Sequence, residues 1–178
     1  MIGVLWAAAV LLGSAGWAKV IRPAPAADSV RAARLPAGGL LALPIMIRAI
    51  GLVEILVAAT VLVLGGTVAA ALLAISYLLL TFVAGRMFRT APGTDCGCFS
   101  RTTAPIGRWH LIVNVGAFLV ASFAVVWPSP GVLAEFESEG WATLPVLVLA
   151  IVLAWLCQLL MTALPALLAL RTKVAAAQ

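Results

Sequence analysis

Charged residues are scarce in this chain, and their scarcity excludes most classes of soluble protein. Only 10% of its 178 residues are charged, whereas soluble domains carry about 25%. Apolar residues make up 65% of the chain, more than its polar groups could cover in water. The same composition excludes intrinsic disorder, which requires low hydrophobicity and high charge. The net charge of +5 does not indicate nucleic-acid binding, because the basic residues stand at the ends of apolar runs.

Motifs for common energy-coupled and hydrolytic chemistry are also missing. The chain has no P-loop, no Gly-x-Gly-x-x-Gly following a strand and no His-Glu-x-x-His. Nucleotide-driven transport and zinc proteolysis therefore have no support, and we expect no bound metal. Three cysteines are too few for a scaffold held together by disulfides.

Long apolar runs dominate what is present. Each is long enough, or nearly so, to cross about 30 Å of hydrocarbon as a helix. The five runs cover residues 2–21, 40–64, 67–83, 109–127 and 144–170. No basic segment precedes the first run, which favours a retained span over a signal peptide. We therefore predict an all-α, multi-pass helical bundle in the lipid bilayer, with five transmembrane helices.

The charges between the runs are distributed unevenly. Ten of the eleven Lys and Arg residues fall in the connection that begins at Lys19, in the connection at 86–108 and in the tail; the eleventh is Arg48. The connection between the last two runs has none and contains Glu135, Glu137 and Glu139. The positive-inside rule then predicts an outside N-terminus in the cell (inner) membrane, with the 86–108 connection and the C-terminus cytoplasmic. We divide the chain into a four-helix core (1–127), an acidic outside loop (128–142) and a fifth helix with a basic tail (143–178).

The connection at 86–108 contains the densest chemical signal. Cys96 and Cys98 flank Gly97, and two cysteines at this spacing can close a small ring in which glycine relieves the steric cost. Strain makes such a disulfide easier to reduce, which suits thiol exchange. Two alternatives stay open: a pair of reduced loop cysteines, and part of a metal site that would need further ligands.

The sequence around these cysteines resembles the MauE/DoxX-like membrane proteins. The Cys96-Gly97-Cys98-Phe99 core is similar to the family's Cys-Gly-Cys-Phe-Gly motif, with Ser100 in place of the last glycine. Gly51 and Glu54 resemble a family pattern in the second span, and Asn114 resembles a family asparagine. The resemblance covers residues 2–126 and implies a redox role for Cys96 and Cys98, with Glu54 as a polar site.

The family's role is linked to methylamine metabolism. The resemblance implies support for maturation of the disulfide-rich small subunit of a quinone-cofactor dehydrogenase, with a thioredoxin-like protein, a dehydrogenase subunit or a quinone as partner. That enzyme matures outside the cytoplasm, whereas the charge pattern predicts a cytoplasmic motif. Three arrangements would reconcile them: electrons cross from a cytoplasmic reductant, the loop folds back into the bundle, or the family function does not extend to this member.

Three further residues within the apolar runs could contribute to function. Glu54 lies about 21 Å along a helix that starts at Leu40, where a carboxylate marks either a functional site or a clamp whose partner comes from another helix. His110 could donate or accept a proton during thiol exchange, or could be an interfacial residue. Cys157 is expected to be packing.

These residues leave three functions open, and whether the protein is an enzyme stays open with them. The first is a redox-associated membrane protein, the second a non-catalytic scaffold or assembly factor, and the third a small proton-coupled transporter that uses Glu54.

Overall fold

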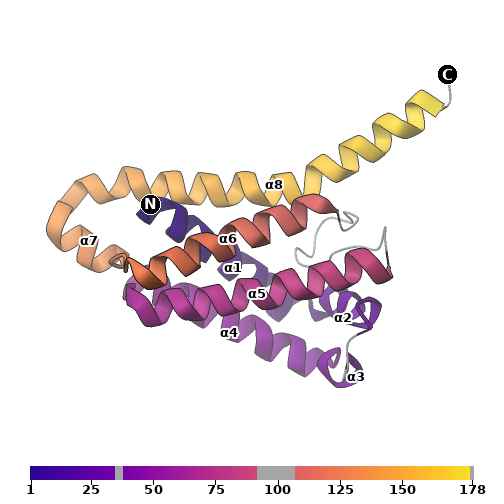
Figure 1. Cartoon of the computed structure of the whole chain (residues 1–178), viewed down its shortest axis with the longest axis horizontal. Coiled ribbons are helices and arrows are strands. Elements are labelled where there is room, and N and C mark those ends of the chain that lie inside the picture. The colour runs from indigo at the N-terminus through magenta and orange to yellow at the C-terminus, as the bar shows by residue number, and fades with distance from the viewer. Residues whose placement is uncertain (35–37, 92–106, 177–178) are drawn as a thin grey trace.

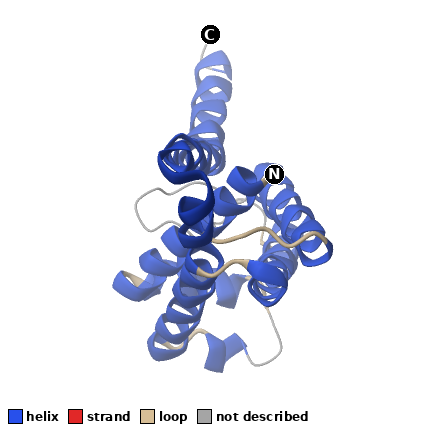
Figure 2. Cartoon of the chain, turned by 90° about the vertical axis from the view of Figure 1, so that its left-hand side faces the viewer, coloured by secondary structure: helices blue, strands red, loops and turns tan. Residues whose placement is uncertain are grey.

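The described parts of the chain are almost entirely helical (Figures 1 and 2). The computed structural model describes the backbone of residues 1–34, 38–91 and 107–176 and the side chains of most of them. The helices are α1 (Ile2–Ile21), α2 (Pro23–Ala32), α3 (Gly38–Leu41), α4 (Pro44–Val63), α5 (Gly66–Thr90), α6 (Arg108–Val126), α7 (Val132–Glu139) and α8 (Thr143–Ala176). Within the described ranges there is no strand, which confirms the all-α prediction.

Five helical stretches of the described chain are long and apolar enough to cross a membrane. They are α1, α4, α5, α6 and the stretch from Val132 to Pro165. The first of them is the most enclosed: 56% of its apolar window is buried, against 33% or less for the others. It packs against α4 and α8, while α5 packs against α6. The multi-pass prediction is therefore confirmed, with α1 at the centre of the bundle.

Small side chains let these helices approach closely. Alanines from α1, α4, α5 and α6 fill the main core together with Leu12, Leu73 and Tyr77. In lipid, helix association depends on such close packing, since the surrounding acyl chains are as apolar as the helices. Large apolar side chains instead cover much of the outer surface, as at Leu56 and Val68.

Two helix boundaries differ from the prediction. The second span begins at Pro44, not Leu40, because proline is favoured in the first turn of a helix, where its missing N–H is not needed. The third span continues past Val83 to Thr90, so Arg86 is helical. The Thr90 hydroxyl donates to the carbonyl of Ala32 at 3.0 Å, which ties the extended end of α5 to α2.

The bundle has a basic end and an acidic end. Figure 1 shows α2, α3 and the C-terminal end of α5 at one end, with α7 at the other. Arg48, exposed near the start of α4, belongs to the basic end. The predicted acidic loop is largely helical, because α7 contains Glu135, Glu137 and Glu139.

A glycine turn closes the acidic end between α4 and α5. Gly65 has a positive φ of 66°, a conformation that side chains other than glycine rarely adopt. An added Cβ there would also meet the backbone of Pro130 and Gly131. The N–H of Gly66 donates to the carbonyl of Ser129 at 3.0 Å, so this turn packs directly on the chain that follows α6.

The last helix is longer than a membrane span requires. Its 34 residues extend for about 51 Å. Pro165 lies inside it, and in Figure 1 the C-terminal part of α8 turns away from the bundle. Proline removes one helical hydrogen bond and is a common cause of such a bend.

Candidate functional site

The two cysteines of the predicted redox pair lie outside the described residues. Cys96 and Cys98 belong to the 92–106 segment. The described chain on either side ends in α5 at Thr90 and resumes in α6 at Arg108, and these two helices pack side by side. The segment that contains the motif therefore connects the C-terminal end of α5 to the start of α6.

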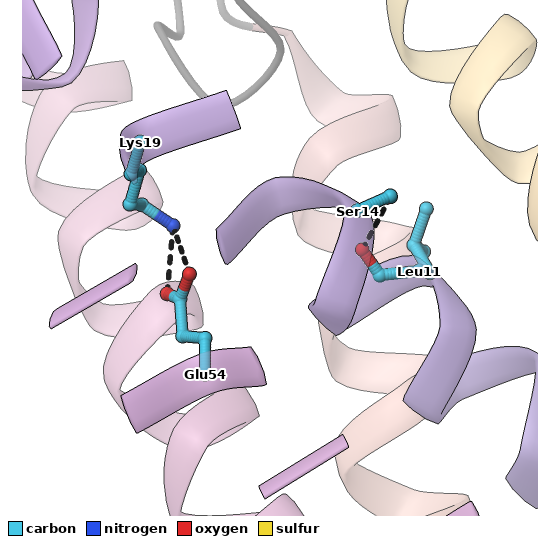
Figure 3. A network of polar contacts seen from close by, with 4 residues as sticks. All are labelled: Leu11, Ser14, Lys19 and Glu54. Atoms are coloured by element: carbon cyan, nitrogen blue, oxygen red, sulfur yellow. Dashed lines mark hydrogen bonds and ion pairs between the residues drawn. The ribbon is translucent and has the colours of Figure 1, made fainter. Parts of the chain in front are cut away.

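A buried ion pair joins α1 to α4. The Nζ of Lys19 lies 2.7 Å from Oε1 and 2.6 Å from Oε2 of Glu54, so the ammonium donates to both carboxylate oxygens (Figure 3). The two side chains are only 8% and 7% exposed. The prediction that the partner of Glu54 comes from another helix is confirmed. Arg48, on the same helix as Glu54, is exposed and takes no part.

The pair stands beside the closest approach of the two helices. A Cβ added to Gly16 would lie 2.6 Å from the carbonyl oxygen of Gly51, and one added to Gly51 would lie 2.6 Å from that of Gly16. Only glycine allows the two backbones to come this near. The ion pair brackets this crossing, because a Cβ on Gly16 would lie 3.0 Å from the Cβ of Glu54 and one on Gly51 would lie 3.0 Å from the Cβ of Lys19.

The position of Lys19 corrects the sequence-based charge map. Lys19 was predicted in the first basic connection, but it lies in the last turn of α1 with its side chain buried. Glu54 lies ten residues after Pro44, about 15 Å along a helix of about 30 Å, so it stays halfway along this apolar span. A carboxylate at that depth is costly alone, and the ammonium compensates for its charge.

A second polar group lies under the start of α6. His110 and Asn114 share one helix face and are 2% and 8% exposed. The alternative of an interfacial histidine is therefore wrong: His110 points into the bundle because its face of α6 packs against α5 and α1. Its Nδ1 accepts a hydrogen bond from the backbone N–H of Gly107 at 3.4 Å.

The only tyrosine of the chain completes this polar group. Tyr77, on α5, is 1% exposed, and its hydroxyl donates to the carbonyl oxygen of Ala8 on α1 at 2.7 Å. Sequence reasoning missed it. A single tyrosine inside a long apolar run was the available signal, because a buried hydroxyl needs a hydrogen-bond partner.

Two cavities adjoin these residues. One of about 20 Å³ is lined by Tyr77, His110 and Asn114 together with Leu11, Leu12, Ala15, Leu80 and Met161. The other, of about 260 Å³, lies between α1, α6 and α8 and is lined by apolar side chains and Cys157. Cys157 thus borders an apolar space. Among the residues that the structure describes, no three His, Cys, Asp or Glu side chains are grouped to hold a metal ion.

Comparison with known proteins gives one match. Residues 1–128 match the family model described as methylamine utilisation protein MauE. That range includes α1 to α6, both polar groups and the Cys96–Cys98 motif. No curated protein and no solved structure matches the chain.

Proposed function

Because the chain belongs to the MauE family, we propose that it is a membrane thiol–disulfide protein in which Cys96 and Cys98 exchange electrons with a thioredoxin-like partner. With the motif on the cytoplasmic side, electrons from a cytoplasmic reductant would cross the membrane through this protein and support maturation of the disulfide-rich small subunit of an extracytoplasmic quinone-cofactor dehydrogenase. The observation that carries the proposal is the Cys-Gly-Cys motif within the family-matched region, attached between two packed helices.

The exchange balances with a disulfide-bearing partner. The thiolate of one cysteine attacks the partner's disulfide, forms a mixed disulfide and releases a partner thiolate, which takes up a proton. The second cysteine then attacks the mixed disulfide, closes the Cys96–Cys98 ring and releases the partner as a dithiol. Two electrons pass to the partner, and a second dithiol protein returns the pair to its reduced form by the reverse steps. The same steps run backwards would oxidise a partner.

We assign the proton of this exchange to His110. It stands in the first turn of α6, the helix that directly follows the cysteine segment, and its imidazole is buried beneath that end. A neutral imidazole can accept a proton from an attacking thiol and return it to a leaving thiolate. Burial shields this transfer from bulk water.

A quinone fits the described interior only in part. The 260 Å³ cavity is apolar and could hold a section of an isoprenoid tail. The polar cavity beside His110, at about 20 Å³, is too small for a quinone ring. We therefore assign no step to a quinone and favour the thioredoxin-like partner.

Glu54 is best explained as a clamp. Both of its oxygens accept hydrogen bonds from Lys19, so its charge is compensated inside the bundle. This pairing favours a role in holding α1 to α4 over proton-coupled transport.

The test of the redox proposal compares cysteine variants in cells that make the dehydrogenase. Cys96→Ser and Cys98→Ser should each abolish correct disulfide formation in the small subunit as fully as the double variant, because one thiol cannot complete the cycle. Cys157→Ser is the matched control and should leave maturation unchanged. A double variant that still matures the enzyme would overturn the redox proposal in favour of a scaffold.

The basic end is proposed to face the cytoplasm, by the positive-inside rule. Lys19 is buried inside the bundle and Arg48 is exposed at the basic end, so the excess of positive charge at that end remains. A variant that retains only Cys96 should react with a membrane-impermeant maleimide after lysis and not in sealed cells. Ser138→Cys, in exposed α7 of a cysteine-free background, should react in sealed cells. The opposite labelling pattern would reverse the orientation.

A further inference from the structure

The small cavity under α6 contains polar side chains with unmet hydrogen-bonding capacity. Asn114 is 8% exposed, and its amide makes no hydrogen bond within the described part of the chain. An amide has two donor hydrogens and an acceptor oxygen, and burying it without a partner is costly. Buried amides in proteins therefore nearly always have a partner, either in the protein or in an ordered water.

The contact of His110 with Gly107 at the start of α6 favours one tautomer of the imidazole. The N–H of Gly107 points at Nδ1 at 3.4 Å, a long contact that favours the tautomer in which Nδ1 carries no hydrogen. A neutral imidazole then carries its hydrogen on Nε2, which makes this atom a donor. No protein acceptor for Nε2 lies among the described residues, while His110 lines the cavity with Asn114.

Tyr77 offers an acceptor to the same space. Its hydroxyl hydrogen is already donated to the carbonyl of Ala8. The phenolic oxygen keeps lone pairs that can accept a hydrogen bond. The residues that line the cavity thus offer a donor on His110 and acceptors on Asn114 and Tyr77.

The size of the cavity selects the ligand. A cavity needs roughly 10–15 Å³ to hold one water molecule, and this cavity has about 20 Å³. The water also needs two to four polar partners. The larger neighbouring cavity lacks such partners and is expected to exclude water, because apolar cavities stay dry.

We propose that one water molecule is bound in this cavity, accepting from His110 Nε2–H and donating to the carbonyl oxygen of Asn114 and to the oxygen of Tyr77. The water is a structural ligand of the bundle: it connects α5 to α6 where the two helices face α1. It also gives the buried imidazole a partner with which to exchange a proton. The water site does not depend on the proposed redox function.

The single histidine of the chain makes the site directly observable. The full-length protein would be labelled with ring-¹⁵N histidine and placed in phospholipid nanodiscs, and magnetisation transfer from water protons to Nε2–H would be recorded by NMR. A soluble gadolinium chelate would suppress transfer from bulk water. We expect one Nε2–H signal with a water cross-peak that persists in the presence of the chelate.

Three variants test the partners. Asn114→Leu removes an acceptor and fills the space, so the cross-peak should be lost, whereas Asn114→Ser keeps a polar atom and should retain it. Val115→Leu, on the exposed side of α6, is the matched control and should also retain it. A resolved Nε2–H signal without a water cross-peak in the unmodified protein would overturn the proposal, and so would a cross-peak that survives Asn114→Leu.

Discussion

Removal of one member of the Lys19–Glu54 pair should destabilise the bundle more than removal of both. In the unmodified protein the ammonium of Lys19 lies 2.7 and 2.6 Å from the two carboxylate oxygens of Glu54. In Glu54→Met the ammonium stays between α1 and α4, and both of these acceptors are lost. In Lys19→Met the carboxylate is left in the same position. In the double variant two flexible apolar side chains of similar length fill the space, and no charge is buried.

The magnitude follows from the burial of the pair. Both side chains are less than 10% exposed, so water cannot compensate the remaining charge. Breaking such a buried pair costs about 3–5 kcal/mol, whereas replacing both members with apolar residues is often neutral or stabilising. We therefore expect each single substitution to lower the free energy of unfolding by about 3–5 kcal/mol. The free energy of unfolding of the double variant should be close to that of the unmodified protein.

The assay is reversible unfolding in mixed micelles, with SDS as denaturant and far-UV circular dichroism as the signal. The exposed Asp28–Arg31 pair, with side chains 74% and 57% exposed, supplies the control. Asp28→Asn should change the free energy of unfolding by less than about 1 kcal/mol, as surface pairs do. Single variants that lose under about 1 kcal/mol, or a double variant that loses the sum of the two singles, would refute the clamp.

Three further predictions concern the glycine crossing, the hydrogen bond of Tyr77 and the role of Cys157. Gly16→Ala should destabilise the protein in the same SDS titration, because its Cβ would lie 2.6 Å from the backbone oxygen of Gly51. Gly39→Ala is the control and should not, because no atom lies within 4 Å of its added Cβ. Equal effects of the two substitutions would contradict the close crossing. Tyr77→Phe should cost about 0.5–1.5 kcal/mol in that titration, because it removes one buried hydrogen bond between α5 and α1 while the carbonyl of Ala8 keeps its donor within the helix. A neutral effect would count against the hydrogen bond. Cys157→Ser should leave the redox state of Cys96 and Cys98 unchanged on alkylation gels, because Cys157 borders an apolar cavity. A change in the redox state of these two cysteines would give Cys157 a redox role.

Composition and hydropathy predict the fold well because the membrane constrains it strongly. In lipid, every backbone N–H and C=O of a spanning segment must be paired internally, so a long apolar run has little alternative to a helix. The first run matches α1 from Ile2 to Ile21. The end of α5 could not be read from hydropathy, because its last turns carry arginine and are held by contacts with α2.

The candidate site was predictable only where its residues share one helix. The spacing of His110 and Asn114 places them on one face, and both face the interior. The pairing of Lys19 with Glu54 spans 35 positions, and that of Tyr77 with Ala8 spans 69. Such contacts depend on which helices are neighbours and how each is rotated, which no local pattern specifies. Lys19 was assigned to a connection because a basic residue at the end of a run usually reaches the headgroups.

The redox state of Cys96 and Cys98 in growing cells tests the central claim most directly. Cells would be quenched with acid and the free thiols alkylated with a maleimide of high mass, and the protein would be resolved on a non-reducing gel. Thiol cycling predicts two populations for the unmodified chain, separated by two alkylated cysteines, and collapse to the reduced form after brief treatment with dithiothreitol. Cys157→Ser should show the same two populations. A chain in which both cysteines are fully reduced under every growth condition, and which still supports the dehydrogenase when both are serine, would contradict the claim.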